Sequence, residues 1–200
     1  MSTLPNRSFI EDMWLYMRRI SLFEKEDWSV YFAWVGLMVG LLVGVCGFVF
    51  TGYFKGVVYP DYVWNVPFGT FVFIVAIAFD TIGHRTVYKQ ALKSGESLVH
   101  HITIAAGISS VLLLCMAYYH RDLLAIPALC LVAISIFYSV IDEAMHWFRY
   151  SAGKSDRIEM WSHFFIFVGH TIMIIGWSHW FLQGYPGVAE TLSAFAKAPA

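Results

Sequence analysis

The sequence has few charged residues and few cysteines. Only 14% of its 200 residues are charged and 58% are hydrophobic, whereas soluble domains are roughly 45–50% apolar. The near-neutral net charge of −1 gives no reason to expect a nucleic-acid partner. Cys46, Cys115 and Cys130 have no paired spacing, so neither a disulfide framework nor a thiolate zinc site is suggested. No glycine-rich dinucleotide loop or flavin motif is present, so a redox reaction would need an external electron donor.

The hydrophobic residues are gathered into five long blocks. The blocks are continuous rather than alternating, and each approaches the roughly 20 residues that a helix needs to cross a bilayer. Because lipid admits only helices or closed barrels, we predict an all-α fold, a polytopic membrane helix bundle. The five predicted transmembrane helices cover about residues 29–54, 64–84, 98–119, 123–145 and 160–182.

The remaining segments are short. Residues 8–23 place hydrophobic side chains among charged ones, which predicts an N-terminal interfacial helix within a cytoplasmic segment of residues 1–28. That segment is polar and mixed, which is not typical of a cleaved signal peptide. Residues 184–200 are small and polar, and predict a short, loosely ordered external tail. We therefore expect one transmembrane helical domain over residues 1–183, followed by this tail.

The basic residues predict an orientation. Five spans place the N-terminus and the loops near 85–97 and 147–158 on one side of the membrane. That side carries all of the 13 Lys and Arg residues except Lys55, Arg121 and Lys197. By the positive-inside rule it is the cytoplasmic side. We therefore expect an integral protein of a bacterial inner membrane, with a cytoplasmic N-terminus and an external C-terminus.

One face of the first block consists of small residues. Gly36, Gly40 and Gly44 are spaced by four, and such a face lets another helix approach closely. This spacing predicts helix packing rather than chemistry. It would also suit packing against partner membrane proteins and the surrounding membrane lipids.

Acids and histidines recur together near one predicted end of the bundle. Four blocks carry an acid four residues before a histidine, and residues four apart share one face of a helix. With 14 acids in 200 residues, chance would give less than one such pair among eight histidines. The pairs lie at one depth on four helices and could converge. They are Asp80/His84, Glu96/His100, Asp142/His146 and Glu159/His163.

These residue types predict a metal site. Ionisable groups within a membrane span are costly and by default mark a functional site facing the bundle interior. Imidazole with carboxylate suits iron, manganese or zinc, and helical bundles hold two metals with paired carboxylates and Glu-x-x-His motifs. EAMH (143–146) matches that motif. The number of donors exceeds the four that zinc uses, which favours a two-metal centre. The ten candidate ligands are Asp80, His84, Glu96, His100, His101, Asp142, Glu143, His146, Glu159 and His163.

This arrangement resembles the membrane-embedded non-haem di-iron oxygenases, which include lipid desaturases, fatty-acid and carotenoid hydroxylases and alkane hydroxylases. The resemblance covers residues 80–163, where VHHI (99–102) partly matches their histidine boxes, although this chain is richer in carboxylates. It implies a metal-dependent oxidoreductase, of the monooxygenase or desaturase type, with two iron ions. Its lipid-soluble substrate would arrive sideways from the bilayer. Electrons would come from a ferredoxin, a reductase or quinol.

A basic surface offers a place for such a donor. Positive-inside topology also explains its charges. It consists of Arg18, Arg19, Arg85, Lys89 and Arg149.

Three other functions use the same residues. A zinc-dependent membrane hydrolase would bind an activated water. A haem protein that transfers electrons to quinone could use His170, near mid-span, as an axial ligand. An accessory subunit of a larger membrane metalloenzyme complex, or a metal carrier, needs no catalysis. For His170 we favour a hydrogen bond to a neighbouring helix.

Single acids also have simpler interpretations. Asp156 could cap a helix, with Glu159 three residues later as its partner. Ser94 could cap another helix in the same way, with Glu96 two residues later. Asp142 and Glu143 could instead form ion pairs with Arg149 or Arg85. Some acids would then orient a ligand histidine rather than bind metal themselves.

Overall fold

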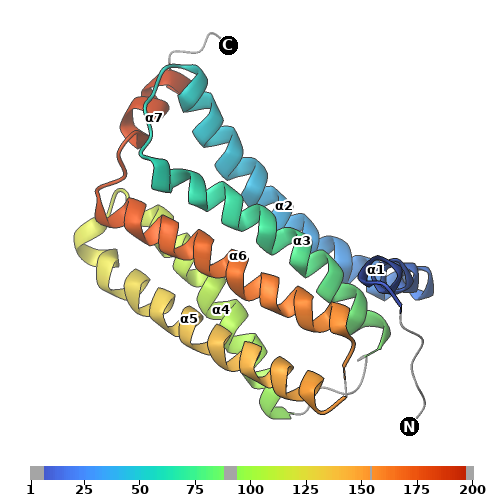
Figure 1. The fold of residues 1–200 in the computed structure, drawn as a ribbon. Helices are drawn as coiled ribbons and strands as arrows, with labels where there is room; N and C mark the ends of the chain where they lie inside the picture. Colours follow the sequence, from blue (N-terminus) through green and yellow to red (C-terminus); the bar gives the residue numbers. More distant parts are fainter. Residues whose placement is uncertain (1–6, 88–93, 154, 197–200) are drawn as a thin grey trace.

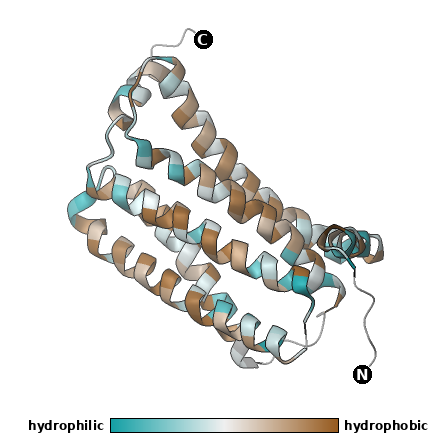
Figure 2. Cartoon of the chain, viewed as in Figure 1, coloured by the Kyte–Doolittle hydropathy of each residue, from teal (hydrophilic) through white to brown (hydrophobic). Residues whose placement is uncertain are grey.

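The computed structural model of the chain describes residues 7–87, 94–153 and 155–196, apart from the side chains of Ser94 and Glu96. Within these ranges it is helical, without strands, and five helices are long and apolar enough to cross a membrane. Figure 2 shows hydrophobic residues along most of their length. The predicted all-α fold with five apolar helices is confirmed. The five are α2 (Lys25–Phe54), α3 (Asn65–Thr86), α4 (Ser94–Met116), α5 (Arg121–Ser151) and α6 (Arg157–Leu182).

The helices extend beyond the predicted spans. We expected the first to begin near residue 29, but α2 begins at Lys25. There the Asp27 carboxylate accepts a hydrogen bond of 3.0 Å from the backbone N–H of Glu24 and so closes the helix start. The fourth predicted span ends near residue 145, but α5 continues to Ser151, because hydropathy marks only the apolar part of a helix. The short segment η2 (Asp61–Trp64) leads into α3.

The predicted N-terminal helix is present as α1 (Phe9–Arg18), followed by η1 (Arg19–Leu22). It lies across the end of the bundle where α3 ends and α6 begins (Figure 1). Two ion pairs fix it there: Arg19 binds Asp156 at 2.6 Å and Arg157 binds Asp12 at 2.7 Å. Its position at a membrane interface stays a prediction.

Four helices form a four-sided arrangement. α3 packs along α6, α4 packs along α5, and these two helix pairs meet where α5 packs against α6 (Figure 1). α2 packs on the outside of α3. On the fourth side, the Cα atoms of α3 and α4 stay more than 8 Å apart throughout the described residues. α4 also contacts α6, and side chains bridge α3 and α4, since the ring centroids of His84 and His100 lie 5.5 Å apart.

The closest helix contact uses glycines that we had not singled out. A Cβ at Gly69 of α3 would lie 2.8 Å from the carbonyl oxygen of Gly169 in α6, so the two backbones touch. By contrast, a Cβ at Gly36, Gly40 or Gly44 would meet nothing within 4 Å. The predicted packing face of α2 is not used by the described part of this chain, and packing against a partner stays a prediction.

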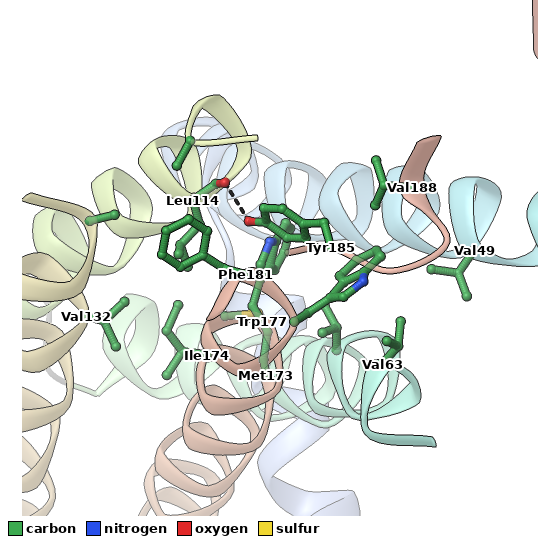
Figure 3. Packing of buried hydrophobic residues seen from close by; sticks show 14 of the residues in the cluster. Val49, Val63, Leu114, Val132, Met173, Ile174, Trp177, Phe181, Tyr185 and Val188 are labelled. Atoms are coloured by element: carbon green, nitrogen blue, oxygen red, sulfur yellow. Dashed lines mark hydrogen bonds between the residues drawn. The ribbon is translucent and has the colours of Figure 1, made fainter. Parts of the chain in front are cut away.

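The main hydrophobic core lies at the end of the bundle far from α1, and we call this the aromatic end. Figure 3 shows Trp177, Phe181 and Tyr185 packed together with Leu114 and Ile174. The Tyr185 hydroxyl donates a hydrogen bond of 2.5 Å to the Leu114 carbonyl oxygen, which ties the segment after α6 to α4. Burying these large side chains supplies much of the apolar stabilisation of the bundle.

The segment after α6 is more ordered than we expected. We predicted a loosely ordered tail over 184–200, but α7 (Val188–Ala196) is a helix. It buries Val188 and Thr191, and the Thr191 hydroxyl is hydrogen-bonded to the hydroxyl of Tyr59. The prediction of a loosely ordered tail was wrong because we inferred a spacer from the small residues, although they recur with helical periodicity.

Candidate metal centre

Six histidine and aspartate side chains from four helices meet at the end of the bundle near α1. We call these six the cluster. Asp80 of α3 lies six residues before Thr86, where α3 ends, and His163 lies six residues after Arg157, where α6 begins. At 1.5 Å per residue the cluster is about 9 Å inside the helix ends. Its members are Asp80, His84, His100, Asp142, His146 and His163.

One group of donors joins α3 and α6. Asp80 Oδ1 lies 3.0 Å from His163 Nε2, and Asp80 Oδ2 lies 3.5 Å from His84 Nε2. Each of the three residues offers a ligand atom, and these atoms all lie within 4.8 Å of one another. The predicted pair Asp80/His84 therefore faces a third donor from a different helix, as convergence requires.

A second group joins α5 to α6 and shares His163 with the first. The ligand atoms of Asp142, His146 and His163 also lie within 4.8 Å of one another. The rings of His146 and His163 are stacked with centroids 3.1 Å apart. His100 of α4 completes the cluster, with its Nδ1 3.3 Å from Asp142 Oδ2. Two overlapping ligand groups fit a centre of more than one ion.

The buried donor atoms of the cluster mostly face one another. Asp80 Oδ1 and His163 Nε2 lie 3.0 Å apart, within hydrogen-bond distance, whereas Asp142 Oδ1 makes no hydrogen bond with any residue that the structure describes. Buried polar atoms are normally hydrogen-bonded, and each unsatisfied one costs about 1–3 kcal/mol. Oxygen and nitrogen lone pairs gathered in one place are what a cation would satisfy. The gathered donor atoms of Asp80, Asp142 and the histidines therefore also fit a bound cation.

The donor chemistry also fits. The cluster offers imidazole nitrogens and carboxylate oxygens, the set that suits iron, manganese and zinc without thiolate. Two aspartates bring two negative charges into a helix bundle, and buried charges need compensation. Divalent cations would provide it. Metal binding itself stays a prediction.

Glu159 is not part of either ligand group. Its buried carboxylate accepts a hydrogen bond of 2.8 Å from Arg149 Nη2, and its Oε1 lies 3.7 Å from Nδ1 of His146. Arg149 Nη2 also donates a hydrogen bond of 2.6 Å to Nδ1 of His146, so Glu159 acts on His146 through Arg149. From this position an acid can help to orient a ligand histidine.

The simpler interpretations of Asp156, Asp142 and Glu143 are not what the structure shows, whereas the side chains of Ser94 and Glu96 lie outside the described residues. The side chain of Asp156 makes no capping bond at the start of α6 and instead binds Arg19. Arg85 binds Asp27, with Nε 2.8 Å from Oδ1, and Arg149 binds Glu159. Both arginines that were candidate partners of Asp142 and Glu143 thus bind other acids.

Three further predicted ligands are not placed in the cluster. His101 is exposed on α4, and its Nδ1 lies 2.5 Å from the carbonyl oxygen of Ser97 in its own helix. Successive helix residues are about 100° apart, so His101 points away when His100 points in. The structure thus does not bring His101 to the cluster. The side chain of Glu96 lies outside the described residues, and Glu143 stands beside Asp142 on α5 without belonging to either group.

His170 lies deeper on α6. Its Nε2 is 2.9 Å from Ser135 Oγ and its Nδ1 is 3.3 Å from Ser139 Oγ, both on α5. The predicted hydrogen bond to a neighbouring helix is confirmed. We had not predicted the serines. The spacing of Ser135, Ser139, Asp142 and His146 places all four on one helix face and could have indicated them.

No protein-family model, curated protein or solved structure matches the chain. The function proposed below is therefore argued from the geometry of the cluster.

Proposed function

We propose that this protein is a membrane-embedded non-haem iron oxidoreductase, with two iron ions bound by the cluster, that hydroxylates or desaturates a lipid-soluble substrate. The observation that carries the proposal is the convergence of six nitrogen and oxygen donors from four helices. The burial of Asp80, Asp142 and His163 supports it, because their side chains are at most 8% exposed and belong to groups of ligand atoms within 4.8 Å of one another. Six donors exceed the four that a structural zinc site uses.

The ligands divide between the two helix pairs. Asp80, His84 and His163 belong to α3 and α6, whereas Asp142, His146 and His100 belong to α5 and α4. Each helix pair thus supplies one carboxylate and two imidazoles. This even division supports two ions rather than one, with Glu143 close enough in sequence to contribute a further carboxylate.

The chain's own residues would hold the ions, set their geometry and exclude bulk water. Bound iron would supply the activation of dioxygen. Arg149, held by Glu159, donates a hydrogen bond to Nδ1 of His146 and would so fix the orientation of that ring. The apolar helices around the cluster would keep the reacting groups away from water.

Electrons must come from outside the chain, from a ferredoxin, a reductase or quinol. The proposed docking surface is less basic than the sequence indicates, because Arg19, Arg85 and Arg149 bind Asp156, Asp27 and Glu159. A quinol arriving through the bilayer needs no basic surface, which favours it among the donors. We also propose, from the positive-inside rule, that the cluster end faces the cytoplasm of a bacterial inner membrane.

Elemental analysis and an absorption spectrum of the detergent-purified protein test the proposal together. We expect close to two irons per chain and no Soret band. A single zinc would replace the proposal with a hydrolase, and a Soret band would replace it with a haem protein. No metal after reconstitution with ferrous iron and zinc would leave the chain as an accessory subunit.

A further inference from the structure

A cleft lies at the aromatic end of the bundle, far from the cluster. It has a volume of about 460 Å³, which falls within the range of small-molecule sites. One wall is the loop that follows α2, from Lys55 to Val58, and the other is formed by Gly187, Glu190 and Ala194 before and along α7. Figure 1 shows α7 beside the end of α2. The proposed function does not use this cleft.

Buried contacts hold the two walls together. The hydroxyls of Tyr59 and Thr191 are hydrogen-bonded to each other, which ties the loop after α2 to α7. Gly187 has a φ of +87°, and a Cβ there would lie 2.6 Å from the Tyr59 ring, so glycine is needed for this close approach. The cleft therefore keeps its shape without a ligand, which lowers the entropic cost of binding one.

The cleft carries one charge of each sign. Lys55 and Glu190 are both exposed, and neither forms an ion pair with another residue that the structure describes. The Lys55 ammonium and the Glu190 carboxylate thus lie more than 4.0 Å apart on opposite walls. Lysine binds phosphate as a point charge, and a carboxylate forms charge-assisted hydrogen bonds with an ammonium group. A ligand that carries both a phosphate and an ammonium group would therefore satisfy both walls.

Exposed apolar side chains surround the cleft at the end of an apolar helix. Lys55 directly follows α2, which is long and apolar enough to cross a membrane. Phe54 is 79% exposed, and Val58, which lines the cleft, is 89% exposed. On α7 the exposed Phe195 ring lies 6.1 Å from the Phe48 ring of α2. Aromatic and apolar side chains beside charged ones are typical of the level of lipid headgroups.

We propose that this cleft binds the headgroup of a phosphatidylethanolamine lipid, with Lys55 at the phosphate and Glu190 at the ammonium group. The headgroup carries one charge of each sign, as the cleft does. The anionic headgroup of phosphatidylglycerol would bring its phosphate to Lys55 but leave Glu190 without a partner. The quaternary ammonium of phosphatidylcholine has no N–H to donate to Glu190. The acyl chains of the bound lipid would lie against the exposed Phe54 and Val58.

Native mass spectrometry of the delipidated protein in detergent tests the cleft. Phosphatidylethanolamine, phosphatidylglycerol and phosphatidylcholine with identical acyl chains are titrated separately, and the affinities of the first lipid bound are compared. We expect phosphatidylethanolamine to bind several-fold more tightly than either of the other two lipids. Equal affinity for all three lipids would overturn the inference.

Charge variants assign the preference to the cleft. Lys55→Ala and Glu190→Gln should each remove it, and Glu190→Lys should shift the preference to phosphatidylglycerol, because both walls would then be positive. Lys25→Ala and Glu26→Gln are the matched controls, since both residues are exposed at the other end of α2, and they should keep the preference of the parent. A preference that survives both Lys55→Ala and Glu190→Gln would overturn the inference, because the lipid would then bind elsewhere.

Soluble phosphoethanolamine distinguishes a lipid from a free ligand of the same chemistry. It carries a phosphate and an ammonium group but no acyl chains, so it should displace the lipid only at a far higher concentration. Displacement at an equal concentration would overturn the assignment to a lipid, because the cleft would then bind a soluble amine phosphate. None of these measurements depends on metal, so their outcome is independent of the proposed function.

Discussion

The two ends of the bundle are built by the same long helices but satisfy their buried polar atoms in opposite ways. At the aromatic end, the hydroxyl of Tyr185 is bound to the Leu114 carbonyl, and Trp180 Nε1 donates a hydrogen bond of 3.0 Å to the carbonyl oxygen of Pro186. At the cluster end, the carboxylates of Asp80 and Asp142 face histidines: Asp80 Oδ1 lies 3.0 Å from His163 Nε2, and Asp142 Oδ2 lies 3.3 Å from His100 Nδ1. At the aromatic end these side chains thus bond to backbone carbonyls, whereas at the cluster end ionisable side chains from different helices face one another.

This difference separates what substitutions should do at each end. Removing apolar volume at the aromatic end should lower the free energy of unfolding and leave metal content unchanged. Removing a donor at the cluster end should abolish or weaken metal binding and change stability less. The two buried carboxylates there are themselves unfavourable in the metal-free protein.

The largest effect is expected from His163→Ala. His163 belongs to both ligand groups, so its removal should abolish nearly all metal binding. Metal per chain, measured by elemental analysis after reconstitution, checks this. His101→Ala is the matched control, because His101 is exposed and bonded within its own helix, and it should keep the full metal content. Equal loss in both variants would contradict the assignment of the cluster.

A smaller loss of affinity is expected from Glu159→Gln. The change weakens the ion pair that holds Arg149 against Nδ1 of His146, but it removes no ligand. Metal affinity should fall roughly 10- to 100-fold, the range typical of acids that orient ligand histidines. Competition with a chelator of known affinity measures it.

Asp156→Asn serves as the control for Glu159→Gln. It breaks an ion pair with Arg19 near the start of the same helix, without contact to the cluster. Affinity should then be unchanged. An unchanged affinity in Glu159→Gln as well would mean that Glu159 only binds Arg149.

At the aromatic end, Leu114→Ala should lower the free energy of unfolding by about 2–5 kcal/mol, because it leaves a cavity beside Phe181 and Tyr185. Leu114 is fully buried. Leu112→Ala, on the exposed side of α4, should change stability little. Denaturation in detergent measures both, and metal content should be the same in the two variants. Loss of metal in Leu114→Ala alone would show that the two ends are coupled.

The smallest effect concerns Tyr185 and pH. Burial raises the pKa of the Tyr185 phenol above its ordinary value of 10.0. The protonated phenol is therefore favoured in the folded protein, and its stabilisation is complete below pH 10. As pH rises above 10, the unfolded chain ionises first and the stabilisation declines, by at most about 1.4 kcal/mol per pH unit.

Tyr185→Phe should be less stable than the parent by about 1 kcal/mol at neutral pH, because the bond to Leu114 is lost. The difference between the two should shrink at alkaline pH. Unfolding curves between pH 8 and pH 11 compare them. A constant difference would mean that Tyr185 does not titrate in this range.

Much of the site was predictable from residue spacing, because an i, i+4 pair shares a helix face whatever the tertiary packing. Asp80/His84 and Asp142/His146 both reach the cluster for this reason. Spacing does not give the rotation of one helix against another. Glu159 and His163 share a face too, yet Glu159 sits one turn nearer the helix end and meets Arg149 instead.

The remaining features depend on contacts between distant segments. The touching of Gly69 and Gly169 decides which helices pair, and it cannot be read from either segment alone. The wider spacing of α3 and α4 follows from that pairing. The choice of His100 over His101 was within reach of the sequence, since neighbouring residues of a helix cannot both face one point.

The even division of donors means that bound metal would link the two helix pairs. α3 with α6 and α4 with α5 each carry one aspartate and two histidines, and they meet otherwise where α6 contacts α5 and α4. A ligand that binds only the assembled form stabilises it by mass action. Metal supply would therefore set how firmly the two helix pairs hold together. A shortage of metal would separate the pairs before it unwound any helix.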